Sequence, residues 1–378
     1  MTTVTAPDGV AGTTGTAGTT GAPGATDSTE VQVARDAERR RGRGVLRHGW
    51  TRSGGLVIAL GVLVLVAFCS VAFGAKPIRF DTVWDALWHP DGSSDHLIVR
   101  SLRVPRTIIG LGVGAALGLA GAVMQGVTRN PLADPAILGI ESGAALAVVI
   151  GIQTFGISAL SGYVWFSFVG AAVASVVVYA IGSAGRGGAT PVKLALAGAA
   201  LSAMLSSFTS AILLTDIETL DQFRFWVVGS LAGRDASTAS QAAPFLLVGT
   251  VLALASARSL NALALGDDVA RSLGQRVHAA RAVSALSVVI LCGAATAAAG
   301  PIGFVGLTVP HVARAICGPD YRWILPWSMV LAPTLLLGAD VIGRLVARPG
   351  ELQVGIVTAT LGAPFFIALV RRRKLAEL

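Results

Sequence analysis

"RVPRTIIGLGVGAALGLAGAVMQGVTRNPLADPAILGIESGAALA", residues 103–147, contains two long apolar runs that a short polar segment separates. The first run, 106–127, is long enough to cross a bilayer as a helix, because a span needs about 20 consecutive apolar residues. The polar segment carries Pro131 and Pro135, and proline is a residue at which one helix ends and the next begins. The stretch therefore predicts two consecutive membrane helices, joined by a bend whose polar side chains, including Asp134, lie at the aqueous edge.

The whole chain has the composition of a membrane protein. Of its 378 residues, 53% are hydrophobic and only 13% are charged, and the mean hydropathy is +0.70. A soluble domain carries about 25% charged residues, so a soluble globular protein is excluded. A barrel is excluded because its strands would be alternating segments of about 10 residues. We predict an all-α polytopic membrane protein of ten transmembrane helices. They are expected at 55–74, 106–127, 136–155, 163–184, 192–214, 239–258, 281–300, 301–318, 325–346 and 354–370.

The N-terminal segment differs from the rest of the chain. It begins with a Thr/Gly/Ala low-complexity stretch and continues with a basic one, and neither can bury a core. We predict a disordered tail over 1–50 and a transmembrane domain over 55–373. The alternative is a secretory signal that is cleaved after "AFGA", but the apolar run at 55–74 is long for such a signal.

Basic residues predict the orientation in the membrane. With both termini inside the cell, 20 of the 29 Lys and Arg residues fall in the tails and inner loops. Cytoplasmic segments are enriched in these residues, so we predict a multi-pass cell-membrane protein with both termini in the cytoplasm. The net charge of +8 arises from this distribution. The sequence contains no basic stripe with interleaved aromatic residues, so nucleic-acid binding is not predicted.

The sequence contains a weak internal repeat. A shift of 179 residues aligns 114–139 with 293–318, and nine of 26 positions match, including Pro131 with Pro310. Ten spans would then divide into two halves of five. An odd number of crossings in each half predicts an inverted repeat, which is a common plan of transporters.

Three glycines, Gly110, Gly114 and Gly118, recur at every fourth position of the second span. They share one helix face and allow another backbone to approach closely. Packing within the chain is the simpler interpretation, and a subunit interface is the alternative.

The stretch 103–147 resembles the signature of the FecCD-type permeases, which are membrane subunits of ATP-binding-cassette importers for iron–siderophore, haem and vitamin B12. Three further stretches agree with this resemblance in order and spacing. They are "FWVVGSLAGRD" (225–235), "LALGDDVARSLGQRV" (263–277) and a long one that begins at "GPIGFVGLTVPHVARAICG" and ends near 373.

The resemblance implies a set of partners. A second permease copy or paralogue, two cytoplasmic ATPase subunits and an extracytoplasmic substrate-binding protein are expected. The sequence is compatible with this, because it has no G-x-x-x-x-G-K-[ST] phosphate loop, so ATP would be hydrolysed by the partners. We expect no catalytic residue, no cofactor and no metal site in this chain; Cys69, Cys292 and Cys317 lack metal-site spacing.

The inner segment 260–280 is the predicted contact with the ATPase. It is long enough for two short helices, and "GDDVARSLG" resembles the coupling helix of the family. The residues expected to act in coupling are Gly266, Asp267, Asp268, Ala270, Arg271, Leu273 and Gly274. A solvated loop would explain the charges, but it explains the small and apolar residues less well.

Arginines at the predicted outer ends of the spans form the second candidate site. In the family that this chain resembles, arginines at the positions of Arg103, Arg106 and Arg344 receive acidic residues of the binding protein. An Arg side chain suits this role because its planar fork can hold a carboxylate with two hydrogen bonds. The alternatives are anchoring at the lipid headgroups and, for Arg344, a pair with Asp340 one helical turn away.

Three polar residues within or directly beside the spans remain. Glu141 is an ionisable residue in an apolar run, and such residues are functional candidates by default, although local packing is the simpler interpretation. Thr190 lies where related permeases narrow to a cytoplasmic gate, and it is a candidate gate residue. His311 has no convergent Cys, His or carboxylate neighbours in the sequence, so a metal site there is not expected.

Two other classes of protein are the alternatives. A secondary transporter driven by an ion gradient would fit ten spans and an inverted repeat, but it should show several paired intramembrane charges. A membrane-embedded enzyme would need a catalytic constellation, which the sequence does not contain. We therefore predict a permease that imports a ferric-siderophore-type substrate by alternating access.

Overall fold

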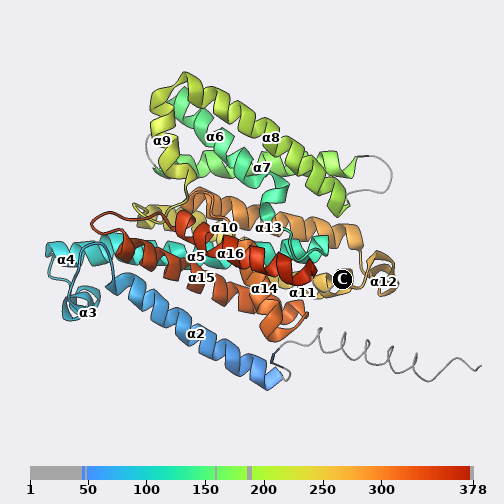
Figure 1. Cartoon of the computed structure of the whole chain (residues 1–378), viewed down its shortest axis with the longest axis horizontal. Coiled ribbons are helices and arrows are strands. Elements are labelled where there is room, and N and C mark those ends of the chain that lie inside the picture. The colour runs from blue at the N-terminus through green and yellow to red at the C-terminus, as the bar shows by residue number, and fades with distance from the viewer. Residues whose placement is uncertain (1–44, 47–48, 158–159, 185–189, 375–378) are drawn as a thin grey trace, which may run out of the picture. The chain divides into compact units, whose positions relative to one another are not determined.

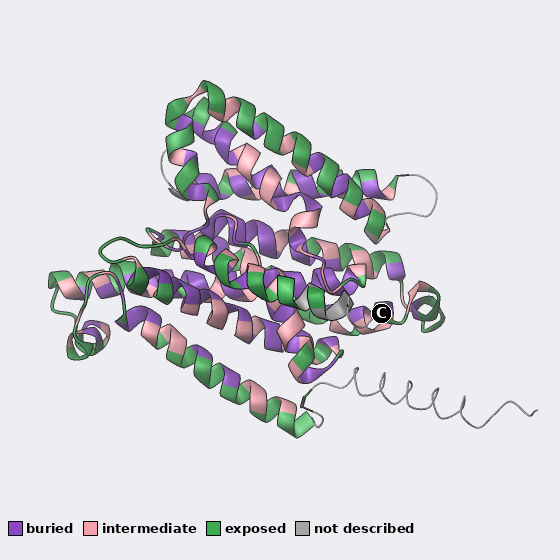
Figure 2. Ribbon diagram, in the orientation of Figure 1, coloured by how far each residue is buried: buried purple, intermediate pink, exposed green. Residues whose placement is uncertain are grey.

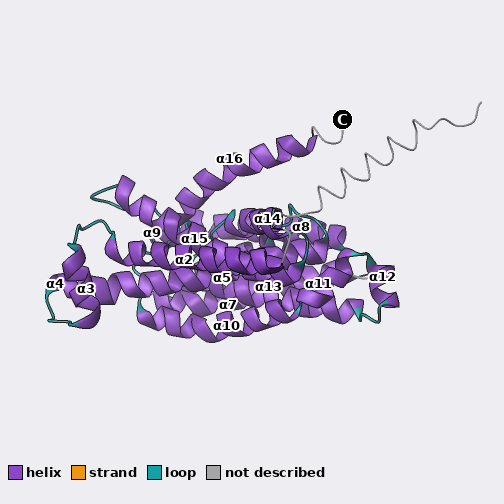
Figure 3. Cartoon of the chain, turned by 90° about the horizontal axis from the view of Figure 1, so that it is seen from below, coloured by secondary structure: helices purple, strands orange, loops and turns teal. Residues whose placement is uncertain are grey.

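The computed structural model describes residues 45–46, 49–157, 160–184 and 190–374. These residues form helices, turns and loops without any strand, which confirms the all-α prediction (Figures 1 and 3). The predicted tail over 1–50 lies largely outside them. Val45 and Leu46 of this segment are described and contact the rest of the protein. Their backbone N–H groups donate to carbonyl oxygens at the end of helix α14 (3.1 and 2.9 Å).

Ten helices correspond to the ten predicted spans. They are α2 (Gly49–Ala72), α5 (Val104–Thr128), α6 (Ile140–Phe155), α7 (Leu160–Ser183), α8 (Pro191–Thr215), α10 (Ala236–Ala255), α13 (Val277–Ala299), α14 (Val305–Cys317), α15 (Tyr321–Val346) and α16 (Val354–Lys374). Within the described residues, seven helices are long and apolar enough to cross a membrane, whereas α6, α14 and the apolar part of α16 are shorter. The chain is therefore a multi-pass helical protein, and a count of ten crossings remains a prediction.

Short helices gather at two opposite ends of the long ones (Figures 1 and 3). Helix α3 (Phe80–Trp88), helix α4 (Ser94–Leu97) and the π-helix η1 (Ile98–Arg103) lie at one end, which we call the α3 end. Helices α11 (Ala257–Ala264) and α12 (Asp267–Ser272) lie at the other, the α12 end. Every candidate site residue can be assigned to one of these ends or to the interior.

Helix α5 is the central helix of the fold and packs against α10, α13, α14 and α15. Its glycine face turns toward α15, where a Cβ at Gly114 would overlap Pro333 and one at Gly118 would overlap Ala332. Without side chains, these positions let the two backbones approach closely. Packing within the chain is thus confirmed as the use of this face.

Helices α6, α7, α8 and α9 (Ile217–Val227) lie together on one side of α13 (Figure 1). Helix α6 contacts the other three, and α7 joins this group to α13. Exposed residues run along α8 and α2 in Figure 2, and many of them are large and apolar, among them Leu196 and Phe208 on α8. Such faces suit lipid or another apolar surface rather than water.

The bend after α5 differs in one respect from the prediction. Arg129 closes α5 in a left-handed conformation (φ 53°) and is exposed, as is Asn130, so these two side chains lie at the edge as expected. Asp134 instead turns inward and accepts a hydrogen bond from the Ala136 N–H (2.9 Å), capping the 3-10 helix η2 (Pro135–Leu138). Pro135 occupies the first position of η2, which its fixed φ suits, and Asp134 directly before it is the N-cap.

The predicted internal repeat is not reproduced in local detail. Pro131 lies in a turn after α5, whereas its counterpart Pro310 lies inside α14. The two aligned segments therefore have different secondary structure where the prolines match, and an inverted repeat remains a prediction.

Candidate functional site

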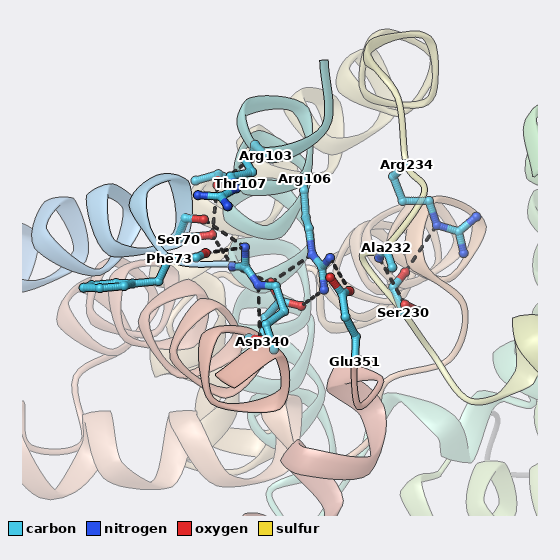
Figure 4. A network of polar contacts seen from close by, with 11 residues as sticks. Ser70, Phe73, Arg103, Arg106, Thr107, Ser230, Ala232, Arg234, Asp340 and Glu351 are labelled. Carbon is cyan, nitrogen blue, oxygen red and sulfur yellow. Dashed lines mark hydrogen bonds and ion pairs between the residues drawn. The ribbon is translucent and has the colours of Figure 1, made fainter. Parts of the chain in front are cut away.

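Two guanidinium groups share one buried carboxylate at the α3 end (Figure 4). Asp340 of α15 has no solvent exposure and accepts two hydrogen bonds from Arg106, Nε to Oδ2 at 3.0 Å and Nη2 to Oδ1 at 2.7 Å. Arg344 Nη2 lies 2.9 Å from Asp340 Oδ2, so the predicted pair one helical turn apart is confirmed. A buried carboxylate needs such partners, because an unpaired charge in the interior is very costly.

A second carboxylate completes the surroundings of Arg106. Glu351, in the loop between α15 and α16, accepts a hydrogen bond from Arg106 Nη1 at 2.7 Å. The side chain of Glu351 is 31% exposed, whereas that of Asp340 is 0% exposed. Arg106 therefore holds one carboxylate in the interior and one at the surface.

Arg103 and Arg344 also cap the C-terminal end of α2. Arg103 donates to the carbonyl oxygens of Val71 and Ala72 (3.1 and 2.6 Å), and Arg344 donates to that of Ser70 (3.0 Å). The last carbonyls of a helix have no partner within the helix, and positive charge is favourable there. The arginines thus fix the end of α2 against α5 and α15.

The structure brings the three predicted docking residues together in this one network. Arg103, Arg106 and Arg344 are only 5%, 8% and 2% exposed, so their charges are used inside the molecule. Other basic residues at the same end are exposed, among them Lys76, Arg79, Arg100 and Arg348. Sequence reasoning missed Glu351, because nothing in a loop carboxylate signals a partner 245 residues away.

Arg234 is a further buried arginine near this network (Figure 4). Its Nε donates to the Ser230 carbonyl oxygen at 3.2 Å, and burial lowers the pKa of its guanidinium to about 10. The neighbouring Asp235 is engaged in capping α10 through the Thr238 N–H (2.9 Å).

At the α12 end, the predicted coupling segment 260–280 forms two short helices, as its length suggested. Glycines with positive φ bound α12 on both sides, Gly266 at 104° and Gly274 at 81°. Glycine adopts these angles without the steric penalty that other residues carry. The chain can therefore turn sharply before and after α12.

Asp267 ties α12 to the rest of the protein. Its Oδ1 lies 2.6 Å from Arg129 Nη2, and both its oxygens accept from Arg281 Nη2 (2.9 and 3.0 Å). Arg129 follows α5 and Arg281 belongs to α13, so one carboxylate joins three elements. The predicted coupling residue Asp267 thus holds α12 in place.

The remaining predicted residues of α12 divide between two faces. Ala270 has no solvent exposure and packs with Leu263 and Val277. Asp268 and Leu273 are exposed, with 98% of the Asp268 side chain accessible, and Asp268 pairs with Arg271 at 2.7 Å. One face of α12 is anchored, and the other presents a charged and apolar surface.

The gate candidate lies at the start of α8. Thr190 caps this helix by accepting a hydrogen bond from the Lys193 N–H at 3.4 Å. Residues 185–189, which precede it in the predicted gate segment, lie outside the described residues.

A bundle of long apolar helices, with ion-paired charges buried at one end and a short exposed helix at the other, is the architecture of a multi-pass membrane protein. The chain belongs to the FecCD transport family, whose profile matches residues 62–372.

Relatives and a solved structure agree with this assignment. The ferric enterobactin transport system permease protein of Escherichia coli (strain K12) is 46% identical over 312 residues, covering 82% of this chain and 93% of the relative. The hemin transport system permease protein of Yersinia pestis is 38% identical, covering 83% and 94%. A metal-chelate type ABC transporter in an inward-facing conformation shares the fold at a TM-score of 0.74 and 27% identity, over 85% of this chain and 99% of that one.

Proposed function

We propose that this chain is the permease subunit of an ATP-binding-cassette importer that carries a ferric-siderophore-type chelate into the cytoplasm. The observation that carries the proposal is the family match over residues 62–372, together with relatives whose names refer to ferric enterobactin and hemin. The sequence has no phosphate-loop motif, so two partner ATPases supply the energy. The chain itself performs no covalent chemistry.

The α12 end is the cytoplasmic end in this proposal, and both termini lie in the cytoplasm. Basic residues support this orientation, since Arg129, Arg271 and Arg281 gather around α12 and cytoplasmic loops are enriched in arginine. The α3 end then faces the extracytoplasmic binding protein.

The ATPase contact is the exposed face of α12. Asp268, Val269, Arg271 and Leu273 offer charges beside apolar side chains, which is the mixture that partner surfaces use. Gly266 and Gly274 set the angle of the helix, while Asp267 and Ala270 transmit its displacement to α5 and α13. A displacement of α12 would therefore be passed to the central helix α5 through the ion pair between Asp267 and Arg129.

Docking of the binding protein at the α3 end works by exchange of carboxylates. An acidic residue of the binding protein would replace Glu351 on Arg106, because Glu351 is the partly exposed partner and Asp340 is not. Arg103 and Arg344 then carry the effect of docking to the end of α2.

Transport needs a second permease copy, identical or paralogous, to enclose the path. The exposed apolar faces of α8 and α16 are available for it. Thr190, at the cytoplasmic start of α8, is the proposed gate residue.

The test is reconstitution in vesicles with the ATPase and the binding protein from the same genome, followed by uptake of ⁵⁵Fe as a siderophore complex. We expect uptake that requires ATP and the binding protein. Uptake that is driven by a sodium or proton gradient without ATP would overturn the proposal in favour of a secondary transporter.

A further inference from the structure

Helix α3 presents three large aromatic side chains on one face. Phe80, Trp84 and Trp88 are spaced four residues apart, so they are neighbours along the helix surface. They are 57%, 56% and 66% exposed, and the rings of Trp84 and Trp88 lie 6.0 Å apart. A contiguous apolar surface of this kind indicates that something other than water covers it.

The other two sides of α3 have different surroundings. Val83 and Ala86 have no solvent exposure and pack with apolar side chains of α2 and η1, so this side holds the helix on the protein. Asp81 and Asp85 are exposed and lie one turn apart on a third side. Helix α3 therefore has a buried, an acidic and an aromatic side, and only the aromatic side lacks the surroundings that its residues require.

The aromatic side of α3 continues the exposed apolar surface of α2. The ring of Phe80 stacks on that of Phe68 in α2 (centroids 6.4 Å apart, planes at 15°), and it meets the ring of Phe73 edge to face at 5.6 Å. Helix α2 is long and apolar enough to cross a membrane, and only five of its 24 residues are buried. Lipid suits the exposed remainder of α2, and the same surface extends onto α3.

The position of α3 corresponds to the level at which α2 leaves the bilayer. Helix α2 ends at Ala72 and α3 begins at Phe80, and α3 lies beside the end of α2 in both views of the chain (Figures 1 and 3). With nine residues, α3 is too short to cross a membrane, since a span needs about 20. Tryptophan is enriched at the membrane surface, because its ring is apolar while its N–H can donate to water or headgroups.

A soluble protein partner is the other kind of surface that an aromatic face can contact. The contact between Phe80 and Phe68 favours lipid, because Phe68 lies one turn inside a helix that is long enough to span the membrane. A soluble partner would have to enter the lipid to cover these two rings.

We propose that α3 is an interfacial helix, which inserts Phe80, Trp84 and Trp88 into the lipid leaflet at the α3 end without crossing it. Lipid covers the aromatic side, and Asp81 and Asp85 face the water, as in other helices that lie in a membrane surface. The proposal holds whichever side of the membrane this end faces, so it does not depend on the proposed transport function.

Insertion of α3 also sets the depth of the arginine network. Lys76, between α2 and α3, pairs with Asp95 of α4 at 2.6 Å, and the Lys76 carbonyl oxygen accepts a hydrogen bond from Arg103. A membrane anchor on α3 therefore fixes the segment that holds Arg103. It places the network at the level of the lipid headgroups, where a soluble partner can reach its exposed side.

The experiment compares two neighbouring positions of α3 that lie on different sides. Trp84→Cys and Asp85→Cys are labelled with a nitroxide in the full chain and reconstituted alone into vesicles of phosphatidylethanolamine and phosphatidylglycerol. Labelled wild type supplies the background from Cys69, Cys292 and Cys317. Electron paramagnetic resonance then measures collisions with O₂, which concentrates in lipid, and with a nickel chelate, which stays in water.

We expect the ratio of O₂ to nickel collisions to be several-fold higher at position 84 than at position 85. Should Trp84→Cys fail to fold, Trp88→Cys on the same side takes its place. Equal ratios at the two positions would overturn the proposal, because the aromatic side would then lie in water and be open to a soluble partner. Low collision rates with both reagents at position 84 would also overturn it, since protein rather than lipid would cover this side.

Discussion

Arg129 Nη2 lies 2.6 Å from Asp267 Oδ1, so the residue that ends the central helix α5 is joined directly to the first residue of α12. Their side chains are 37% and 24% exposed, and Arg281 of α13 completes the contact. The short exposed helix is therefore connected to the buried centre of the fold by a pair of charges that both solvent and a partner can reach.

Breaking this pair should uncouple transport from ATP hydrolysis. Arg129→Ala removes one of two cations on Asp267, and a partly exposed pair contributes only about 0.2–1 kcal/mol to stability. We expect normal membrane insertion and ATPase co-purification, with a lower ratio of substrate transported to ATP hydrolysed. Arg322→Ala, which removes an exposed arginine at the start of α15, is the control for loss of an arginine at this end. An unchanged ratio in Arg129→Ala would contradict this role.

Charge reversal at Asp268 should weaken the association with the ATPase. The side chain is 98% exposed, so Asp268→Lys changes the surface of α12 without affecting the interior. We expect reduced co-purification of the ATPase and reduced uptake, with unchanged insertion. Asp267→Lys would place a lysine between Arg129 and Arg281, and it should lower the Tm as well. If the Asp268 variant retains full co-purification, another surface makes the contact.

Removal of the Asp340 carboxylate should destabilise the protein strongly. Asp340→Ala leaves Arg106 and Arg344 without their shared partner in the interior, and breaking a buried pair costs about 3–5 kcal/mol. Glu351→Gln removes a partly exposed partner of the same Arg106 and should cost about 1 kcal/mol or less. Thermal unfolding in detergent measures both, and similar Tm values for the two variants would argue against the shared-carboxylate network.

The same Glu351→Gln variant tests docking. If an acidic residue of the binding protein takes the place of Glu351, its loss frees Arg106 Nη1 and we expect tighter binding, most evident at low salt. Asp85→Asn removes an exposed acid from α3 at the same end and serves as the control. Affinity for the binding protein, measured in nanodiscs, would be equal in the two variants if Arg106 takes no part.

Close helix packing at Gly121 should tolerate no side chain. A Cβ there would overlap the backbone carbonyl of Gly306 on α14, so Gly121→Ala forces the two helices apart and should cost about 1–3 kcal/mol. Gly338 on α15 faces open space, and Gly338→Ala should change stability by about 0.5 kcal/mol or less. A lower Tm only in the Gly121 variant is the expected result.

The sequence alone determined the helices and their class. Apolar runs of about 20 residues identify membrane helices locally, and the bend at Pro131 and Pro135 separates α5 from α6 without reference to any distant residue. The glycine face of α5 could also be predicted from the sequence, because the spacing of its glycines depends on that helix alone. The family could be recognised from motif order for the same reason.

Only the tertiary structure decided what each charge does. Arg106 and Asp340 are 234 residues apart in the chain, and the sequence around each of them does not predict that they meet in the interior. Asp267 turns toward Arg129 and Arg281 while Asp268 turns to solvent, although both lie side by side in the same short helix. Glu141 reaches a cavity with Asp134 and Thr296 because α6 and α13 pack together there. Hydrophobic length is a local signal, whereas ion pairs and cavities depend on which helices pack side by side.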